Sequence, residues 1–249
     1  MIWCLSSPGK NLLQIQQDFW SVYPHSQGRI ETIQKALSYF LKDFSLFCEE
    51  LKINFWLHGG SLIGAIRHNG FIPWDDDIDI ALTRKDFTIL RDSVEKSQFI
   101  LEELYNDIYP SRGYQLRYRN EPIPVFLDIV IFDFIVIENP TVNALNSYLE
   151  KFRLVQREVS ENFHNFLHAP QLDFASKWHY GVYSAENKKS VDLLFECGNK
   201  KLEISNNGNA MLYALENFPF PYPVMLVNEI TPFKKIKFEG ITVNIPNSW

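Results

Sequence analysis

Four aspartates lie within five positions of the N-terminal half: Asp75, Asp76, Asp77 and Asp79. The last two alternate with isoleucines, and side chains two positions apart in a β-strand point to the same face. We therefore expect Asp77 and Asp79 to share one face of a strand while Ile78 and Ile80 enter the core. Neighbouring carboxylates repel each other unless a cation lies between them. The pattern predicts a divalent metal site, with Mg²⁺ as its usual occupant and Mn²⁺ as the alternative.

A solvated acidic turn is the alternative interpretation of the same segment. It suits Asp75 and Asp76, which follow Pro73, but it does not explain why the next two aspartates alternate with isoleucines. Asp128 supplies a third carboxylate, because it interrupts an apolar run over residues 125–131. A lone charge there would be costly, and a metal, an arginine or a surface position would relieve it. We expect Asp128 in the site and regard Asp133, near the end of the same run, as a weaker candidate.

A glycine pair precedes the acidic segment and could bind phosphate. Gly59 and Gly60 allow backbone amides to approach a phosphate closely, and the helix that follows offers its positive N-terminus. Ser61 could add a hydroxyl contact. Arg67 could form a bidentate pair with a phosphate or carboxylate, or else brace the aspartates after Pro73. A glycine pair alone often makes only a turn, so its position ahead of the alternating aspartates carries the prediction.

The elements that must position these residues follow from periodicity. Apolar residues in three-four alternation predict an amphipathic helix over 29–51 that packs on a sheet. A short strand over 55–57 leads into the glycine turn, and Ser61 is the expected cap of a helix over 62–67 that Asn69-Gly70 ends. Strand, glycine turn, helix, loop and acidic strand therefore follow one another along the chain.

The remaining elements are predicted with the same signals. Thr83 and Asp86 form a variant capping box that opens a helix to about residue 96. Beyond it we expect strands over 114–118 and 124–137 joined by a turn, a long helix from 142 to 166, a helix over 185–197, a shorter helix near 210–217, an extended loop over 218–223 and a hairpin over 234–246. Ser184 is the expected cap and Gly198 the expected end of the helix over 185–197.

Composition excludes several classes of protein. The chain has 249 residues, twenty phenylalanines and a formal net charge of −6 without a basic run, so a large core is expected and nucleic-acid coating is not. Its three cysteines have no zinc spacing, which favours a reducing compartment. Neither a secretory signal nor a membrane-spanning run is present. We expect a soluble cytoplasmic protein, with peripheral contact at the inner membrane surface left open.

One stretch resembles a known family. Residues 59–65 read GGSLIGA, Arg67-His68 follow, and residues 72–79 read IPWDDDID. This segment resembles the hallmark of the LicD family, which includes the fukutin-related proteins. Weaker similarity covers residues 127–129 with Asp133, and residues 238–240 with 245–246. Little motif aligns between about 140 and 232, and the tyrosine-glycine-aspartate motif that family members often carry further on is absent from the printed sequence.

The resemblance implies an α/β (α+β) fold, a nucleotidyltransferase-like mixed sheet flanked by helices with a mainly helical C-terminal part. It divides the chain into an extension (1–28), a catalytic core (29–139) and a helical region with a hairpin (140–249). It also implies transfer of a phospho-substituent, most simply phosphocholine from CDP-choline, to a sugar hydroxyl of a cell-surface glycan such as lipopolysaccharide or teichoic acid. Ribitol or glycerol phosphate would suit the same chemistry, and the acceptor would be a glycan or lipid-linked glycan.

The family's roles transfer to matching positions of this chain. Asp77 and Asp79 would bind the metal, and Asp128 would complete the ligand set or accept the proton of the acceptor. The donor would be held by the following residues: Gly59, Gly60, Ser61, Arg67 and Asp75. Two other hypotheses stay open. The protein could be a non-catalytic relative that binds a CDP ligand or glycan, or a nucleotidyltransferase acting on a small acceptor.

Two further groups of residues are weaker candidates for binding. His164 and His168 have helical zinc spacing but lack the glutamate of the metalloprotease motif, so a solvent-facing pair is the default. An aromatic group in an expected loop could surround a quaternary ammonium; it comprises Trp178, His179, Tyr180 and Tyr183. Packing of those rings is the simpler interpretation.

Overall fold

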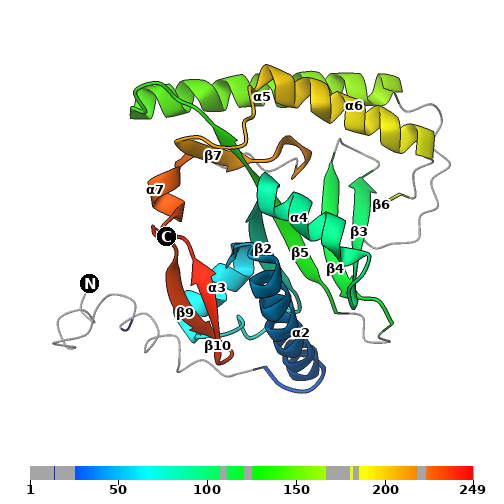
Figure 1. Ribbon diagram of the computed structural model, residues 1–249, viewed down its shortest axis with the longest axis vertical. Coiled ribbons are helices and arrows are strands. Elements are labelled where there is room, and N and C mark those ends of the chain that lie inside the picture. Colours follow the sequence, from blue (N-terminus) through cyan, green and yellow to red (C-terminus); the bar gives the residue numbers. More distant parts are fainter. Residues whose placement is uncertain are drawn as a thin grey trace.

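The computed structural model is an α/β fold (Figure 1) and describes residue 14 and residues 26–106, 111–120, 125–166, 180–181, 185–217 and 223–248. The helices are α2 (Arg29–Leu51), α3 (Gly59–His68), α4 (Arg84–Val94), α5 (Val142–Phe166), α6 (Ala185–Lys201), α7 (Val227–Ile230) and the 3₁₀ turn η2 (Leu215–Asn217). The strands are β1 (Phe55–Leu57), β2 (Ile78–Thr83), β3 (Phe99–Asn106), β4 (Arg112–Tyr118), β5 (Leu127–Ile135), β6 (Tyr180–Gly181), β7 (Ala210–Tyr213), β8 (Met225–Leu226), β9 (Lys234–Phe238) and β10 (Ile241–Ile245).

The main sheet is mixed, with β5 at its centre. Its order is β1-β2-β5-β4-β3-β6, and β7 pairs with the second half of β5 and with β8. Among the described strand pairs of this sheet, β2 and β5 run parallel and the others are antiparallel. The parallel pair brings the acidic segment beside the strand that carries Asp128.

The two faces of the sheet differ. On one face, alternate residues of β2 and β5 join α2 and α4 in a buried apolar core; these are Ile78, Ile80, Leu82, Leu127, Ile129 and Ile131. On the other face, Trp56, Ala81 and Phe132 pack against residues of β7 and α7 at one end of the strands. Because side chains alternate along a strand, Asp79 and Asp128 also belong to this second face.

The C-terminal part covers both ends of the molecule. Helices α5 and α6 pack against each other at one end, and the β9–β10 hairpin lies beside α3 at the other (Figure 1). The hairpin is held by specific bonds: the Glu239 amide donates to the Asn69 carbonyl at 2.9 Å, and Asn244 Nδ2 donates to the Phe55 carbonyl at 2.7 Å. The first bond fixes the C-terminal end of α3, and the second attaches the hairpin to β1.

Several predicted elements are confirmed. The helix over 29–51, the strand over 55–57, the long helix from 142 and the hairpin with its turn at Glu239-Gly240 are all present. Thr83 caps α4 by accepting from the Asp86 amide at 3.1 Å. Asn69, with φ of 57°, ends α3 as expected.

Three predictions are corrected, and one strand was missed. Residues 210–217 form a strand and a 3₁₀ turn instead of a helix, because pairing with β5 buries all four strand residues on both faces. Strand β3 was not predicted. Gly198 does not end α6, which continues to Lys201; a Cβ at Gly198 would lie 2.3 Å from Leu215 Cδ2, so the glycine permits close packing inside the helix. Ser61 is not the cap of α3, which begins two residues earlier. The cap predicted at Ser184 and most of the predicted loop over 218–223 lie outside the described residues.

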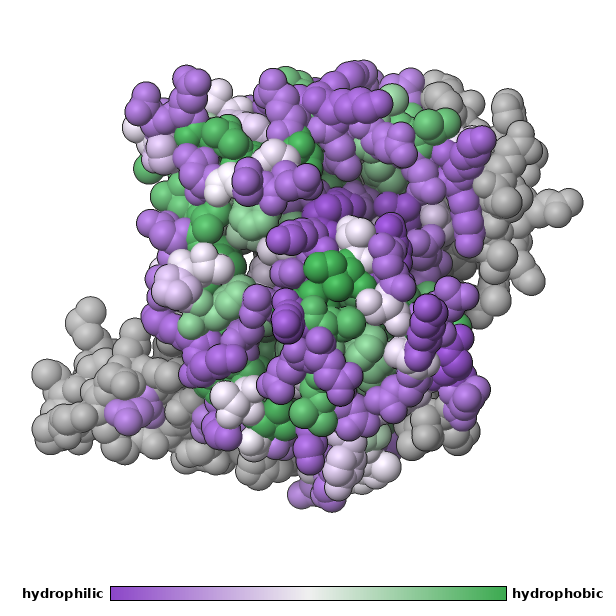
Figure 2. Space-filling model, in the orientation of Figure 1, coloured by the Kyte–Doolittle hydropathy of each residue, from purple (hydrophilic) through white to green (hydrophobic). Residues whose placement is uncertain are grey.

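Hydrophilic residues predominate on the face shown in Figure 2, with smaller groups of apolar residues between them. Within the described parts of the chain, no helix is both long and apolar enough to cross a membrane.

Candidate metal centre

The three predicted carboxylates come together. In the parallel β2–β5 pair, Asp79 lies opposite Asp128, and Asp77 immediately precedes β2. One ligand oxygen from each of the three can be chosen so that all lie within 4.8 Å of one another. The neighbouring residues Ile78 and Ile80 are fully buried, as the alternation predicts. The strand register therefore creates the cluster that the sequence pattern suggests.

The glycine turn closes over this cluster. Gly59 has φ of +51°, a conformation that favours glycine, and a Cβ there would lie 2.5 Å from Asp79 Oδ2. The Gly60 amide donates to Asp79 Oδ2 at 3.1 Å, and the Asp79 amide donates to Ser61 Oγ at 2.9 Å. Ser61 is only 1% exposed. Its hydroxyl therefore joins the helix to the acidic strand instead of capping the helix.

Asp75 is a fourth carboxylate beside the cluster. A Cβ on Gly60 would lie 2.9 Å from Asp75 Oδ2, so this second glycine is also needed for close approach. Gln34 of α2 donates to the Asp75 backbone carbonyl at 2.8 Å and thereby holds the loop in place. The Asp75 Oδ2 atom is buried and accepts no hydrogen bond from the described residues.

The electrostatics of the cluster show uncompensated negative charge. Burial, followed by repulsion from Asp77, raises the pKa of Asp75 and of Asp79 to about 7. Burial likewise raises the pKa of Asp128 to about 6, although a hydrogen bond from Gln115 opposes the shift. The pKa of Asp77 is also raised by burial and by Asp76. Carboxylate oxygens held together against repulsion are the donor set that a hard divalent cation such as Mg²⁺ requires.

The structure separates two other predicted residues from the cluster. Arg67 is exposed in the last turn of α3, about 12 Å along the helix axis from Gly59 at 1.5 Å per residue. Its phosphate contact stays a prediction. Asp133 is fully buried and accepts two hydrogen bonds from Arg84, from Nε to Oδ1 at 2.8 Å and from Nη2 to Oδ2 at 2.7 Å. Asp133 is therefore part of an ion pair away from the three carboxylates.

Three residues near the cluster were not singled out from the sequence. Gln115 Nε2 donates to Asp128 Oδ1 at 2.9 Å, and Arg117 Nη2 donates to Gln115 Oε1 at 2.6 Å. His58, whose backbone amide donates to the Asp79 carbonyl at 3.1 Å, places Nε2 3.1 Å from Tyr213 Oη. Burial lowers the pKa of His58 to about 4, which keeps the imidazole neutral. Alternation along the predicted strand over 114–118 indicates that Gln115 and Arg117 share a face. The register with β5 shows that this is the face of Asp128.

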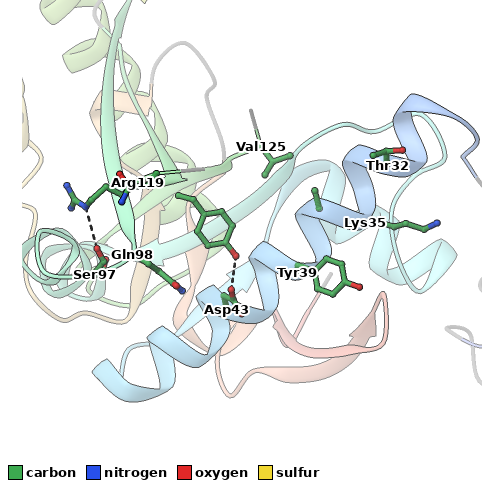
Figure 3. Close-up of a pocket in the computed structure, with 11 residues that line it drawn as sticks. Thr32, Lys35, Tyr39, Asp43, Ser97, Gln98, Arg119 and Val125 are labelled. Carbon is green, nitrogen blue, oxygen red and sulfur yellow. Dashed lines mark hydrogen bonds between the residues drawn. The ribbon is translucent and has the colours of Figure 1, made fainter. Parts of the chain in front are cut away.

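A cavity of about 610 Å³ lies elsewhere, between α2 and the end of β4 (Figure 3). Tyr118, which lines it, belongs to the opposite face of the sheet, because its ring stacks on the core residue Phe40. Its hydroxyl donates to Asp43 Oδ2 at 2.8 Å, and Arg119 Nη2 donates to backbone carbonyls, including that of Phe99 at 2.9 Å. The polar groups of this cavity are thus largely used within the fold.

The two weaker candidates cannot be placed. The side chains of His164 and His168 lie outside the described residues, as do Trp178, His179 and Tyr183 and the side chain of Tyr180. The zinc and quaternary-ammonium interpretations of these residues stay predictions.

Comparison with known proteins supports the resemblance. Residues 52–178 match the family described as LicD/FKTN/FKRP, nucleotidyltransferase domain. A similar protein is the lipopolysaccharide cholinephosphotransferase LicD of Haemophilus influenzae, 32% identical over 141 residues, which is 51% of this chain and 52% of that protein. The ribitol 5-phosphate transferases FKRP of mouse and human are 47% identical over 38 residues, 15% of this chain and 8% of theirs. The match thus spans about half the length of the bacterial relative and a short segment of the mammalian ones.

Proposed function

The chain belongs to the LicD/FKTN/FKRP nucleotidyltransferase-domain family, and on this premise we propose that it transfers a phospho-substituent from an activated donor to a hydroxyl of a glycan. The observation that carries this proposal is the set of three carboxylate oxygens within 4.8 Å of one another under a glycine turn. The finer assignment is phosphocholine transfer from CDP-choline to a lipopolysaccharide-type acceptor with Mg²⁺, or Mn²⁺, as cofactor. The relative's name supports the cholinephosphate group and the lipopolysaccharide acceptor, and the three carboxylates support the divalent ion. The CDP-linked donor follows from the family resemblance.

Asp77, Asp79 and Asp128 would hold the metal. When bound, a divalent ion neutralises charge on the transferred phosphoryl group and on the leaving oxygen. The chain's own contribution is positioning, because Ser61 and Gly60 fix Asp79 through its amide and its Oδ2. Catalysis of this kind requires little covalent chemistry from the protein.

The donor would lie against the first turn of α3. That turn carries the positive end of the helix dipole, which favours the negative diphosphate, and its Gly60 amide already donates to Asp79. The acceptor oxygen would form a bond to the phosphorus of the phospho-substituent while the bond from that phosphorus to the bridging oxygen breaks. The products would be the substituted glycan, CMP and one proton.

The test is a CMP-release assay with CDP-choline, Mg²⁺ and lipopolysaccharide acceptor. Asp77→Asn and Asp79→Asn should each lower turnover by about 100-fold or more, because ion binding supplies several kcal/mol of charge stabilisation. Both variants should keep the fold, since each removes a repelling charge. Asp92→Asn is the matched control, because Asp92 is an exposed aspartate of α4.

The outcomes distinguish the alternatives. Full activity in both cluster variants would overturn the metal assignment. Release of pyrophosphate from a nucleoside triphosphate, in place of CMP from the donor, would indicate nucleotidyl transfer. Magnesium-dependent binding of CDP-choline, seen as thermal stabilisation but with no product from any acceptor, would indicate a non-catalytic relative.

A further inference from the structure

A row of polar residues crosses the sheet through the carboxylate cluster. In the strand register, Asp79 lies opposite Asp128, Asp128 opposite Gln115, and Gln115 opposite Glu102. Residues directly opposite each other on neighbouring strands present their side chains on the same face. The row therefore extends the face of the candidate metal centre across β5, β4 and β3.

Hydrogen bonds join the outer part of this row into a chain. Arg117 Nε donates to Glu102 Oε2 at 2.6 Å, and Arg117 Nη2 donates to Gln115 Oε1 at 2.6 Å. Gln115 Nε2 then donates to Asp128 Oδ1 at 2.9 Å. The guanidinium group also lies over the ring of Phe126, 4.7 Å from its centroid.

The chemistry of the groups fixes the direction of every bond. A guanidinium can only donate, and an ionised carboxylate can only accept. Gln115 must therefore turn its oxygen toward Arg117 and its NH₂ group toward Asp128, so the orientation of this amide does not depend on assigning nitrogen and oxygen by other means. Without Arg117, the amide would lose the partner that selects this orientation.

We propose that Gln115, oriented by Arg117 and Glu102, is a positioning residue that holds Asp128 as a metal ligand. Its bond to Oδ1 leaves Oδ2 of Asp128 to bind the ion. This inference rests on the metal dependence of the proposed function. It assigns Asp128 the ligand role in place of the proton-accepting role that the sequence left open.

The hydrogen bonds from Glu102 to Gln115 are not needed to neutralise a buried charge. The side chains of Arg117 and Glu102 are 29% and 42% exposed, so water could satisfy both groups. Exposed ion pairs of this kind contribute little to stability. Hydrogen-bond partners of metal ligands, in contrast, typically affect metal affinity by 10- to 100-fold. A variant that loses more free energy of metal binding than free energy of unfolding would therefore indicate a positioning role.

The experiment measures Mn²⁺ affinity of the full chain by electron paramagnetic resonance, with thermal unfolding in EDTA recorded for each variant. Gln115→Leu should weaken Mn²⁺ binding about 10- to 100-fold. Arg117→Met keeps the apolar stem over Phe126 and should weaken binding by a smaller factor. Arg117→Lys should recover part of that loss, because an ammonium can still donate to Gln115. Arg153→Met is the matched control, since Arg153 is a half-exposed arginine of α5 paired with Glu150.

The double variant Gln115→Leu/Arg117→Met supplies the decisive comparison. If Arg117 acts through Gln115, the double variant should bind Mn²⁺ no more weakly than Gln115→Leu alone. Additive losses would show that Arg117 does not act through Gln115. Unchanged Mn²⁺ affinity in folded Gln115→Leu would overturn the positioning role of Gln115. If Gln115→Leu does not fold, unchanged affinity in Arg117→Met would overturn the proposal by itself. Absence of Mn²⁺ binding in the unaltered chain would instead contradict the metal dependence of the proposed function.

Discussion

Two acidic side chains on β5 occupy opposite electrostatic environments. Asp133 is fully buried, and both of its oxygens accept hydrogen bonds from Arg84. Arg84 also donates to Glu216, which receives a further bond from Arg112 at 3.3 Å. Asp128, five positions earlier on the other face, has a neutral amide donor and two neighbouring aspartates.

The pKa shifts separate Glu216 from the carboxylates of the cluster, whereas burial raises the pKa of Asp133 against the opposing effect of Arg84. Burial alone would raise the pKa of Glu216, but Arg84 and Arg112 lower it to about 2. No described cation contacts the carboxylate of Asp79 in a comparable way, and burial with repulsion from Asp77 raises its pKa to about 7. Compensated buried charge joins α4, β4, β5 and η2 into one structure. Uncompensated charge costs stability until the group takes up a proton or a cation binds, and such clusters are typical of functional sites.

Removing Arg84 should have the largest effect on stability. Arg84→Met leaves Asp133 without its partner and takes one of two cations from Glu216, and uncompensated buried charges typically cost about 3–5 kcal/mol. Urea denaturation should show this loss, whereas Asp79→Asn in EDTA should be as stable as the unaltered chain or more so. A similar loss in both variants would remove the distinction between the two regions.

Gly59→Ala should lower stability by an intermediate amount. Its effect on metal binding distinguishes backbone strain from the close contact between Gly59 and Asp79. Alanine at φ of +51° costs about 1–2 kcal/mol, and its Cβ would displace Asp79 Oδ2. Gly240→Ala is the matched control, because Gly240 has φ of +79° and no atom of the described residues lies within 4 Å of its Cβ position. Both variants should lose similar stability in urea titrations. Only Gly59→Ala should also weaken Mn²⁺ binding, and equal binding in the two would show that the turn does not position Asp79.

The smallest effect is expected in the pH dependence of the metal-free protein. The pKa of Asp79 is about 7 in the fold and 3.8 as its ordinary value. Between these values the native state binds more protons than the unfolded state, so stability should fall as pH rises from about 4 to 7. His58, whose pKa is lowered to about 4, acts with the opposite sign, since its stabilisation is lost as pH falls below its ordinary value.

Comparison with Asp79→Asn isolates the carboxylate, because His58 is present in both proteins. In EDTA, the decline in unfolding free energy between pH 5 and 8 should be smaller in the variant, by on the order of 1 kcal/mol, because coupling spreads the titration over neighbouring groups. Equal slopes would mean that burial and the neighbouring carboxylates do not raise the pKa of Asp79.

Local signals predicted the parts of the fold that depend on local energetics. Helix α2, the capping of α4 by Thr83 and the turn at Glu239-Gly240 follow from periodicity, side-chain hydrogen bonding and positive φ, which act over a few residues. Strand β7 was mistaken for a helix because a short buried apolar run carries no periodicity that distinguishes the two. Gly198 was mistaken for a helix end because its contact with Leu215 is distant in sequence.

The amino-acid sequence by itself singled out the candidate site residues: alternating aspartates, a glycine pair and an isolated aspartate in an apolar run. Tertiary structure placed Asp128 beside the alternating aspartates, as expected, and decided that Asp133 does not join them, because one strand presents the two to opposite faces and Arg84 lies on the face of Asp133. It also decided that Gln115 and Arg117 support the cluster. Register between strands depends on pairings across the whole sheet, and no local pattern contains that information.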